Sequence, residues 1–211
     1  MHSDIDLVLT TTRSVRKRMD LDRPVDRDVV EECLDLALQA PSGANRQDWA
    51  FVAVDDPAVK AGVSAVYRAA FVDHYGTRSR PSAAGERLPK GVWESAHQLA
   101  DTMHRVPVLM IPVRHSVPPQ ERAGQASWWA SILPAAWSFM LAARSRGLVT
   151  SYTARGCDRE QELAEVLGLE YPGTTQAGII AVGHPDHQVF RAARRRPLAE
   201  VLRWNREDCD G

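Results

Sequence analysis

The sequence is poor in lysine and cysteine. Lys17, Lys60 and Lys90 are its only lysines, against 23 arginines, and yet the formal net charge of the 211 residues is −1. A near-neutral chain of which 25% is charged does not have the composition of a broadly basic nucleic-acid binder. The three cysteines are scattered and form no CxxC pair, which argues against a disulfide framework and favours a reducing compartment.

Several common enzyme motifs are missing as well. The sequence has no GxGxxG after an expected strand and no GxxxxGK[ST], so it encodes neither a Rossmann pyrophosphate turn nor a P-loop. GxSxG and HExxH, the usual signs of a serine hydrolase and a zinc protease, are also absent. His97 and His104 form one pair and His184 and His187 another, but a metal site needs three or four converging ligands. We therefore expect no metal site.

No targeting segment is evident either. Residues 1–18 lack an apolar core of signal-peptide length, because Asp4, Asp6 and the polar run 10–12 interrupt it. Together with the cysteine pattern, this predicts a cytoplasmic protein.

The longest uncharged run, residues 123–143, is long enough to span a bilayer. Six of its residues are Gly, Gln, Ser or Pro, and no second span or topogenic flank accompanies it, so a membrane helix is disfavoured. We expect instead one helix that is buried on most sides. Because a chain of this size rarely surrounds a helix alone, a partner subunit is expected to cover one side.

Hydrophobic periodicity predicts a single domain over residues 1–211 with alternating helices and strands. Helices are expected over 5–15, 26–40, 58–73, 93–104, 123–143 and 158–167, the last with Asp158 as N-cap and Gly168 as C-cap. Strands are expected over 49–54, 106–113, 148–153 and 176–183. This order favours an α+β or α/β fold with one sheet between helical layers. The Arg-, Pro- and Gly-rich segment 74–92 is a candidate lid.

Two clusters of basic residues lie near the ends of the chain. The first contains Arg13, Arg16 and Arg18, and the second runs from Arg191 to Arg196. In a nearly neutral protein, such local clusters fit one or two phosphate groups better than a polyanion. A solvated arginine-rich surface is the alternative that composition alone leaves open.

Four motifs in order resemble the FMN-dependent nitroreductase family. TTRSVRKRMDLDRPV (11–25) is followed by APSGANRQDWAFV (40–52), then by LAARSRGLV leading into TSYTA (141–154), and finally by RRRPLAEVL (194–202). The resemblance covers nearly the whole chain and is least clear over 74–92 and 114–124. It implies an α+β fold in which helices flank a central, mostly antiparallel sheet of four to five strands.

The resemblance also implies which residues bind FMN. Arg13, Ser14 and Arg16 match the RSxR segment that binds the phosphate, the ribityl chain and the pyrimidine edge, with Arg16 beside N1 and O2. A fixed cation at that edge would stabilise the reduced flavin. The family often has an arginine where this chain has Thr12, which leaves one phosphate contact unassigned.

Further FMN-binding residues are implied at three other places. The PSGxN loop corresponds to Pro41, Ser42, Gly43 and Asn45, and the segment facing N5 to Ser151, Tyr152, Thr153 and Ala154. Tyr152 stands where smaller residues are common, so access to that flavin face is expected to differ. Arg195 matches the C-terminal phosphate-binding arginine, with Arg194 and Arg196 as alternatives.

The implied reaction needs no acid–base dyad, because the flavin carries the chemistry. NAD(P)H would transfer a hydride to N5, and a nitroaromatic, a quinone or a related electrophile would then enter the same site, giving ping-pong kinetics. The family forms homodimers with FMN at the subunit interface. In such a site, Tyr75 and Trp93 at the ends of the candidate lid are either stacking groups or ordinary core packing, and packing is favoured.

Three alternatives remain open at this point. Within the same fold, reductive dehalogenases related to iodotyrosine deiodinase share RSVR and APSGA with this chain, but no Glu–Tyr–Lys lid set for an amino-acid zwitterion is evident, which disfavours this alternative. The flavin-fragmenting enzyme of vitamin B12 base synthesis shares the fold, but no local motif selects it. It also fits a flavin-sequestering or regulatory protein with little turnover. Thr12 and Tyr152 differ from the residues that are common in the family at these positions, and this difference is the reason to keep the last alternative.

Overall fold

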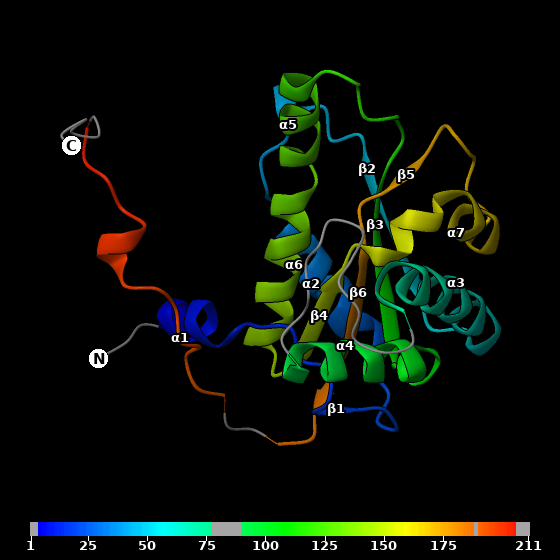
Figure 1. Cartoon of the computed structure of the whole chain (residues 1–211), viewed down its shortest axis with the longest axis horizontal. Coiled ribbons are helices and arrows are strands. Elements are labelled where there is room, and N and C mark those ends of the chain that lie inside the picture. The colour runs from blue at the N-terminus through cyan, green and yellow to red at the C-terminus, as the bar shows by residue number, and fades with distance from the viewer. Residues whose placement is uncertain (1–3, 77–89, 188–189, 206–211) are drawn as a thin grey trace.

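The computed structural model describes residues 4–76, 90–187 and 190–205. Within them, six strands form one sheet in which every strand pair is antiparallel. The long strands lie in the order β4 (Val149–Thr153), β6 (Ile179–Pro185), β3 (Val108–Arg114) and β2 (Trp49–Val54). This antiparallel α+β fold confirms the expected architecture (Figure 1).

Two very short strands bring the count above the expected four to five. β1 (Met19–Asp20) pairs with the end of β6, and β5 (Thr175–Gln176) pairs with β3. β5 and β6 divide the strand expected over 176–183, because Gly178 between them has a φ of 137°, which a β-strand does not accommodate.

Helices cover both faces of this sheet. On one face lie α2 (Arg27–Ala37) and α6 (Leu133–Ser145), and on the other α3 (Pro57–Tyr75), α4 (Lys90–Thr102) and α7 (Glu160–Leu167). Strand residues alternate between these layers, since successive side chains of a strand point to opposite faces. Leu109 and Ile111 pack toward α3, whereas Val108 and Met110 pack toward α6.

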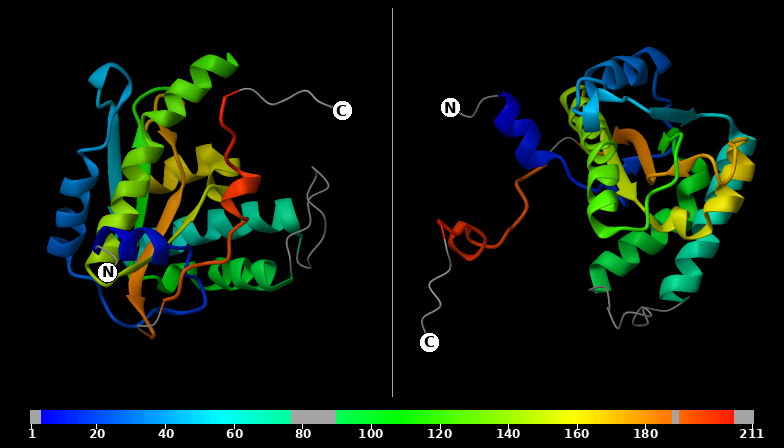
Figure 2. Two further views of the ribbon diagram at one scale, coloured as in Figure 1. Left: turned by 90° about the vertical axis from the view of Figure 1, so that its left-hand side faces the viewer. Right: turned by 90° about the horizontal axis from the view of Figure 1, so that it is seen from above.

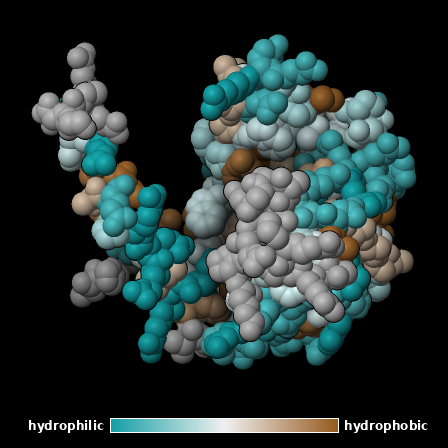
Figure 3. Space-filling view, in the orientation of Figure 1, coloured by the Kyte–Doolittle hydropathy of each residue, from teal (hydrophilic) through white to brown (hydrophobic). Residues whose placement is uncertain are grey.

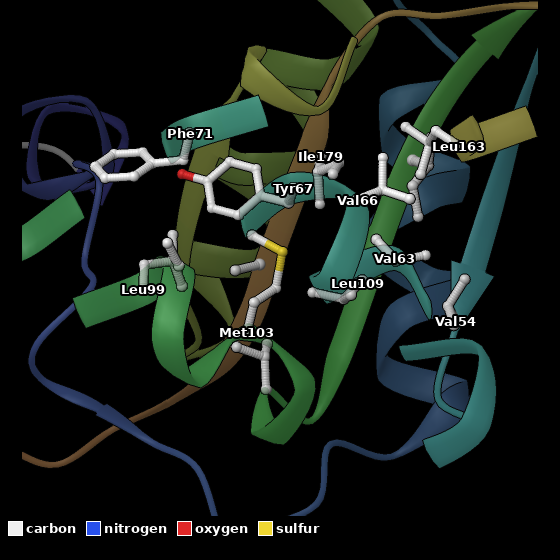
Figure 4. Close-up of a cluster of buried hydrophobic side chains, with 14 of the residues drawn as sticks. Val54, Val63, Val66, Tyr67, Phe71, Leu99, Met103, Leu109, Leu163 and Ile179 are labelled. Carbon is white, nitrogen blue, oxygen red and sulfur yellow. The ribbon is translucent and has the colours of Figure 1, made fainter. Parts of the chain in front are cut away.

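The α3 side contains a core of large buried side chains. Tyr67 and Phe71 of α3 lie over Leu99 of α4 and over Met103, each at most 2% exposed (Figure 4). The rings of Tyr67 and Phe71 are 6.3 Å apart, centroid to centroid. Complete burial of these side chains stabilises the layer that supports β4 and β6 from behind.

The uncharged run does not form the single helix expected over 123–143. It is divided into α5 (Arg122–Ala130) and α6, with a turn at Ser131 and Ile132 between them. Pro134 lies in the first turn of α6, where its missing N–H is tolerated, whereas inside a continuous helix it would break the hydrogen bonding. No helix among the described residues has the length and apolar character needed to cross a membrane.

The last helix also begins later than expected. Asp158 lies in a short 3-10 helix, η3 (Arg155–Arg159), and pairs with Arg155 rather than capping α7, which starts at Glu160. At the other end, Gly168 adopts a left-handed conformation with φ 66° and closes the helix as expected.

The two ends of the described chain project from the body. α1 (Asp4–Thr11) and the C-terminal segment, residues 190–205, extend away from the sheet (Figures 1 and 2). Both carry exposed apolar side chains, and brown residues are visible along the projecting segment in Figure 3. Those side chains are Ile5, Leu7, Leu9, Leu198, Val201, Leu202 and Trp204, which are 41–80% exposed.

Candidate functional site

The RSxR segment lies along the edge of the sheet beside β4. Ser14 forms a parallel bridge with Thr150, and the Val15 N–H donates to the Thr150 carbonyl at 2.9 Å. Val15 is 7% exposed and packs into the core, so it anchors the segment. This pairing brings Arg13 and Arg16 beside the residues of β4.

A cavity of about 570 Å³ opens between this segment and α6. It has the size of a typical small-molecule site, and it combines an apolar wall with a cationic one. Its lining residues are Thr12, Arg13, Ser14, Arg16, Leu133, Ala136, Trp137, Met140, Tyr152 and Arg195. We call it the Arg13 cavity; five of the twelve proposed FMN-binding residues line it.

Arg13 and Arg16 supply positive charge in this cavity, and none of the described residues that line it is a carboxylate. Nη2 of Arg13 donates to the Arg191 carbonyl of the C-terminal segment. Its Nε is buried and has no hydrogen-bond partner among the described residues. An unpaired buried donor on a cation costs free energy, and an anionic group in the cavity would satisfy it. The donor set therefore fits a phosphate.

Thr12 does not take the place of the arginine common at this position. It is 7% exposed, and its hydroxyl donates to the Val8 carbonyl at 2.7 Å, which completes the end of α1. Arg18 does not substitute either. It lines a second cavity, of about 360 Å³, on the other side of the segment, where its Nη1 lies 2.6 Å from Nε2 of His187.

Tyr152 forms part of the cavity wall with its ring held in place. Its hydroxyl donates to the Ala177 carbonyl at 2.5 Å, and the ring lies against Gly178, where an added Cβ would come within 2.7 Å of it. Burial raises the pKa of Tyr152 to about 12, with a smaller contribution from Cys157. Because the hydroxyl already donates its proton to the main chain, Tyr152 contributes to the cavity through the surface of its ring and not as a hydrogen-bond donor.

The raised pKa of Tyr152 can be tested by titration. One phenol is expected to ionise near pH 12, measured as the difference in phenolate absorbance between wild type and Tyr152→Phe. The folded state keeps the phenol protonated above the ordinary pKa of 10, at which the phenol of the unfolded chain ionises. The contribution of Tyr152 to the free energy of unfolding is therefore fully present below pH 10 and is lost as the pH rises toward 12. A difference curve with a midpoint near 10 would contradict the burial described.

The other residues of the 151–154 segment do not line the cavity. Ser151 is fully buried, with its Oγ unpartnered among the described residues. The Thr153 hydroxyl lies 3.5 Å from that of Tyr67, whose pKa is raised by burial, and Ala154 is exposed just before η3. Any cofactor contact from these three residues would therefore come mainly from the main chain.

The PSGxN loop lies apart from the Arg13 cavity within one chain. Pro41, Ser42, Gly43 and Asn45 follow α2, and the Gly43 N–H donates to Ser131 Oγ at 3.0 Å, just before α6 begins. None of the four lines the cavity. The backbone of Asn45 has a φ of 52°, a left-handed conformation that asparagine tolerates better than most residues.

Among the three C-terminal arginines, only Arg195 lines the Arg13 cavity. Arg194 and Arg196 are exposed and contribute no lining. Of the three, Arg195 is therefore the one that the geometry places at this cavity.

The apolar wall of the cavity was not predicted from the sequence. Leu133, Trp137 and Met140 recur at helical spacing on one face of α6, and Trp137 is 44% exposed. The lack of charge in this helix indicated an uncovered side, but composition could not show that this side faces a ligand cavity.

Most of the candidate lid, residues 77–89, lies outside the described residues. At its ends, the Tyr75 ring packs on Phe71 with centroids 5.1 Å apart, and the Trp93 ring packs on His97 at 4.7 Å. Both aromatics have the framework packing that was favoured. In the part of the chain that the structure describes, no group of three or more His, Cys, Asp or Glu residues is placed to hold a metal.

Comparison with known proteins identifies the family. A model of the nitroreductase family matches residues 9–184, a range that includes the RSxR segment, the PSGxN loop and β4. The chain belongs to the nitroreductase family. No curated protein sequence matches it.

Solved structures of the nitroreductase fold resemble the whole chain. One is a putative nitroreductase in complex with FMN from Desulfovibrio desulfuricans, 20% identical with TM-score 0.67, covering 98% of this chain and 99% of that one. Another is the FMN- and NADPH-dependent nitroreductase NfnB from Sphigopyxis sp. strain HMH, 22% identical with TM-score 0.65, covering 96% and 99%. A third is iodotyrosine deiodinase bound to FMN and 3-iodo-L-tyrosine, 18% identical with TM-score 0.69, covering 96% and 100%.

Proposed function

We propose that this nitroreductase-family chain is an FMN-dependent oxidoreductase that takes electrons from NAD(P)H and reduces a nitroaromatic, quinone or related electrophilic acceptor. The observation that carries the proposal is the Arg13 cavity, which Arg13, Arg16 and Arg195 line on one side and apolar residues of α6 line on the other. Solved structures of the same fold that are named as binding FMN or as FMN- and NADPH-dependent support it.

When bound, FMN supplies the two-electron transfer between the nicotinamide and the acceptor. Arg13 would hold the phosphate through its guanidinium, and Arg195 would add a second guanidinium from the C-terminal segment. Arg16 would place a fixed positive charge where reduction adds negative charge, which favours the reduced state. Trp137 and Met140 would cover apolar ring surface and exclude water from it.

The site is proposed to be completed in a homodimer. Within one chain, residues 41–45 lie beside the start of α6, outside the Arg13 cavity, which extends along the following turns to Met140. A two-fold copy packed against α6 would bring its own 41–45 loop toward this cavity. The same packing would cover the exposed apolar side chains of α1 and of the C-terminal segment.

Visible spectroscopy tests the proposed reaction directly. The purified protein is expected to be yellow or to become so with FMN, to bleach when NADH or NADPH is added without oxygen, and to recover its colour when a nitroarene or quinone follows. A protein that FMN cannot reconstitute would refute the proposal. Bound flavin that neither nicotinamide bleaches would favour the flavin-sequestering alternative, and recovery with 3-iodotyrosine alone would favour a dehalogenase.

A further inference from the structure

A further basic cavity, separate from the one that Arg18 lines, lies where α6, β6 and the chain after β1 meet. It has a volume of about 360 Å³, enough for about twelve waters, at roughly 30 Å³ for each. The residues that line it are Arg23, Arg144, Arg146, Gly147, His184 and Pro185. We call it the Arg23 cavity. It lies at the end of the sheet where β1 pairs with β6, low in Figure 1.

Positively charged side chains outnumber carboxylates at the Arg23 cavity. In the part of the chain that the structure describes, no carboxylate lines it. Arg146 has one acidic partner, since its Nε donates to Glu32 at 3.0 Å. Arg144 instead donates to the Thr11 hydroxyl and lies 4.6 Å above the Phe190 ring, and neither contact neutralises its charge. Arg23 has no ion-pair partner among residues 4–76, 90–187 and 190–205.

Arg144 carries an electrostatic cost in its present environment. Burial lowers the pKa of its guanidinium, and the nearby charge of Arg13 lowers the pKa further. Both effects oppose the charged state that arginine nevertheless keeps. A bound anion would offset both, because it would replace lost solvation of Arg144 and add an opposite charge beside it.

Helix electrostatics explains only part of this arrangement. Basic residues in the last turn of a helix are favourable, which accounts for Arg144 and Arg146 at the end of α6. It does not account for Arg23, which follows β1, or for His184, which belongs to β6. Three separate elements converge on one cavity, which is how a ligand site is built.

The Arg23 cavity is distinct from the proposed flavin site. The two cavities have no lining residue in common. We propose that the Arg23 cavity binds the phosphate or diphosphate group of a small ligand. Planar guanidinium groups suit phosphate oxygens because each can donate two parallel hydrogen bonds, and three of them from two elements favour a phosphate over a single carboxylate.

Titration calorimetry with pyrophosphate tests this proposal on the protein as purified, saturated with FMN if it takes up the flavin. Wild type is expected to bind one pyrophosphate per chain, and Arg23→Gln to bind it at least tenfold more weakly. Arg23 is exposed and its side chain makes no hydrogen bond or ion pair with another described residue, so the variant should keep the wild-type melting temperature. Arg122→Gln, which removes one exposed arginine from α5, is the matched control and should stay within twofold of wild type.

The competing explanations predict different results. Equal weakening in Arg23→Gln and Arg122→Gln would mean a general effect of surface charge, and absence of binding would also overturn the proposal. Weakening in Arg195→Gln but not in Arg23→Gln would place pyrophosphate in the Arg13 cavity. Because these comparisons do not require a bound flavin, their failure is distinguishable from failure of the proposed function.

Discussion

Replacing Arg13 with alanine is expected to weaken FMN binding about thirtyfold. The estimate is about 2 kcal/mol for hydrogen bonds from a charged donor, and each 1.4 kcal/mol is a factor of ten in affinity. The physical reason is that the positively charged Arg13 lines a cavity to which the described residues contribute no carboxylate. Quenching of flavin fluorescence on titration measures the dissociation constant.

Riboflavin provides the control for the role assigned to Arg13. It lacks the phosphate, so Arg13→Ala is expected to change riboflavin affinity by no more than about threefold. Arg122→Ala removes an exposed arginine elsewhere and should leave both affinities unchanged. If Arg13→Ala weakens FMN and riboflavin equally, Arg13 supports the shape of the site and does not bind the phosphate.

A glutamate at Leu198 is expected to raise the dissociation constant of the proposed homodimer at least about a hundredfold. Leu198 is 68% exposed on the projecting C-terminal segment. Burying a leucine side chain contributes about 1.5–3 kcal/mol, and burying an unpaired carboxylate adds a further penalty. Sedimentation velocity over a range of concentrations measures the equilibrium, and FMN affinity should fall with the dimer.

Val117→Glu is the matched control for the dimer prediction. Val117 is also apolar and 57% exposed, but it lies between β3 and α5, away from α1 and the C-terminal segment. Its substitution should leave the proportions of monomer and dimer measured by sedimentation velocity unchanged. A wild-type chain that remains a monomer at high concentration, or a Leu198→Glu variant that remains a dimer, would contradict the proposed assembly.

The strands were predictable because their signal is local. Trp49–Val54 is dense in residues that favour strands and is bounded by Asp55, Asp56 and Pro57, and the structure places β2 over those six residues. The break within 123–143 was also encoded locally, by Pro134, but the uninterrupted lack of charge obscured it. The division of β5 from β6 depends on the conformation of Gly178, which hydrophobic pattern alone does not reveal.

The candidate site was predictable only in part, because a cavity depends on long-range packing. The motifs indicated Arg13, Ser14, Arg16, Tyr152 and Arg195, and the structure gathers these five around one cavity. The same motifs could not indicate that residues 41–45 lie apart within one chain, because that depends on where α6 runs. Neither could they indicate the Trp137 wall or the convergence of Arg23 with His184.

The bridge between Ser14 and Thr150 has a consequence for how the chain behaves before it is loaded with cofactor. β4 pairs with β6 on one side, and the RSxR segment occupies part of its other side. If that segment detaches, β4 becomes an open edge whose N–H and C=O groups can recruit a strand from another molecule. A ligand that holds Arg13 in place also keeps this edge covered, so flavin supply would limit aggregation during expression.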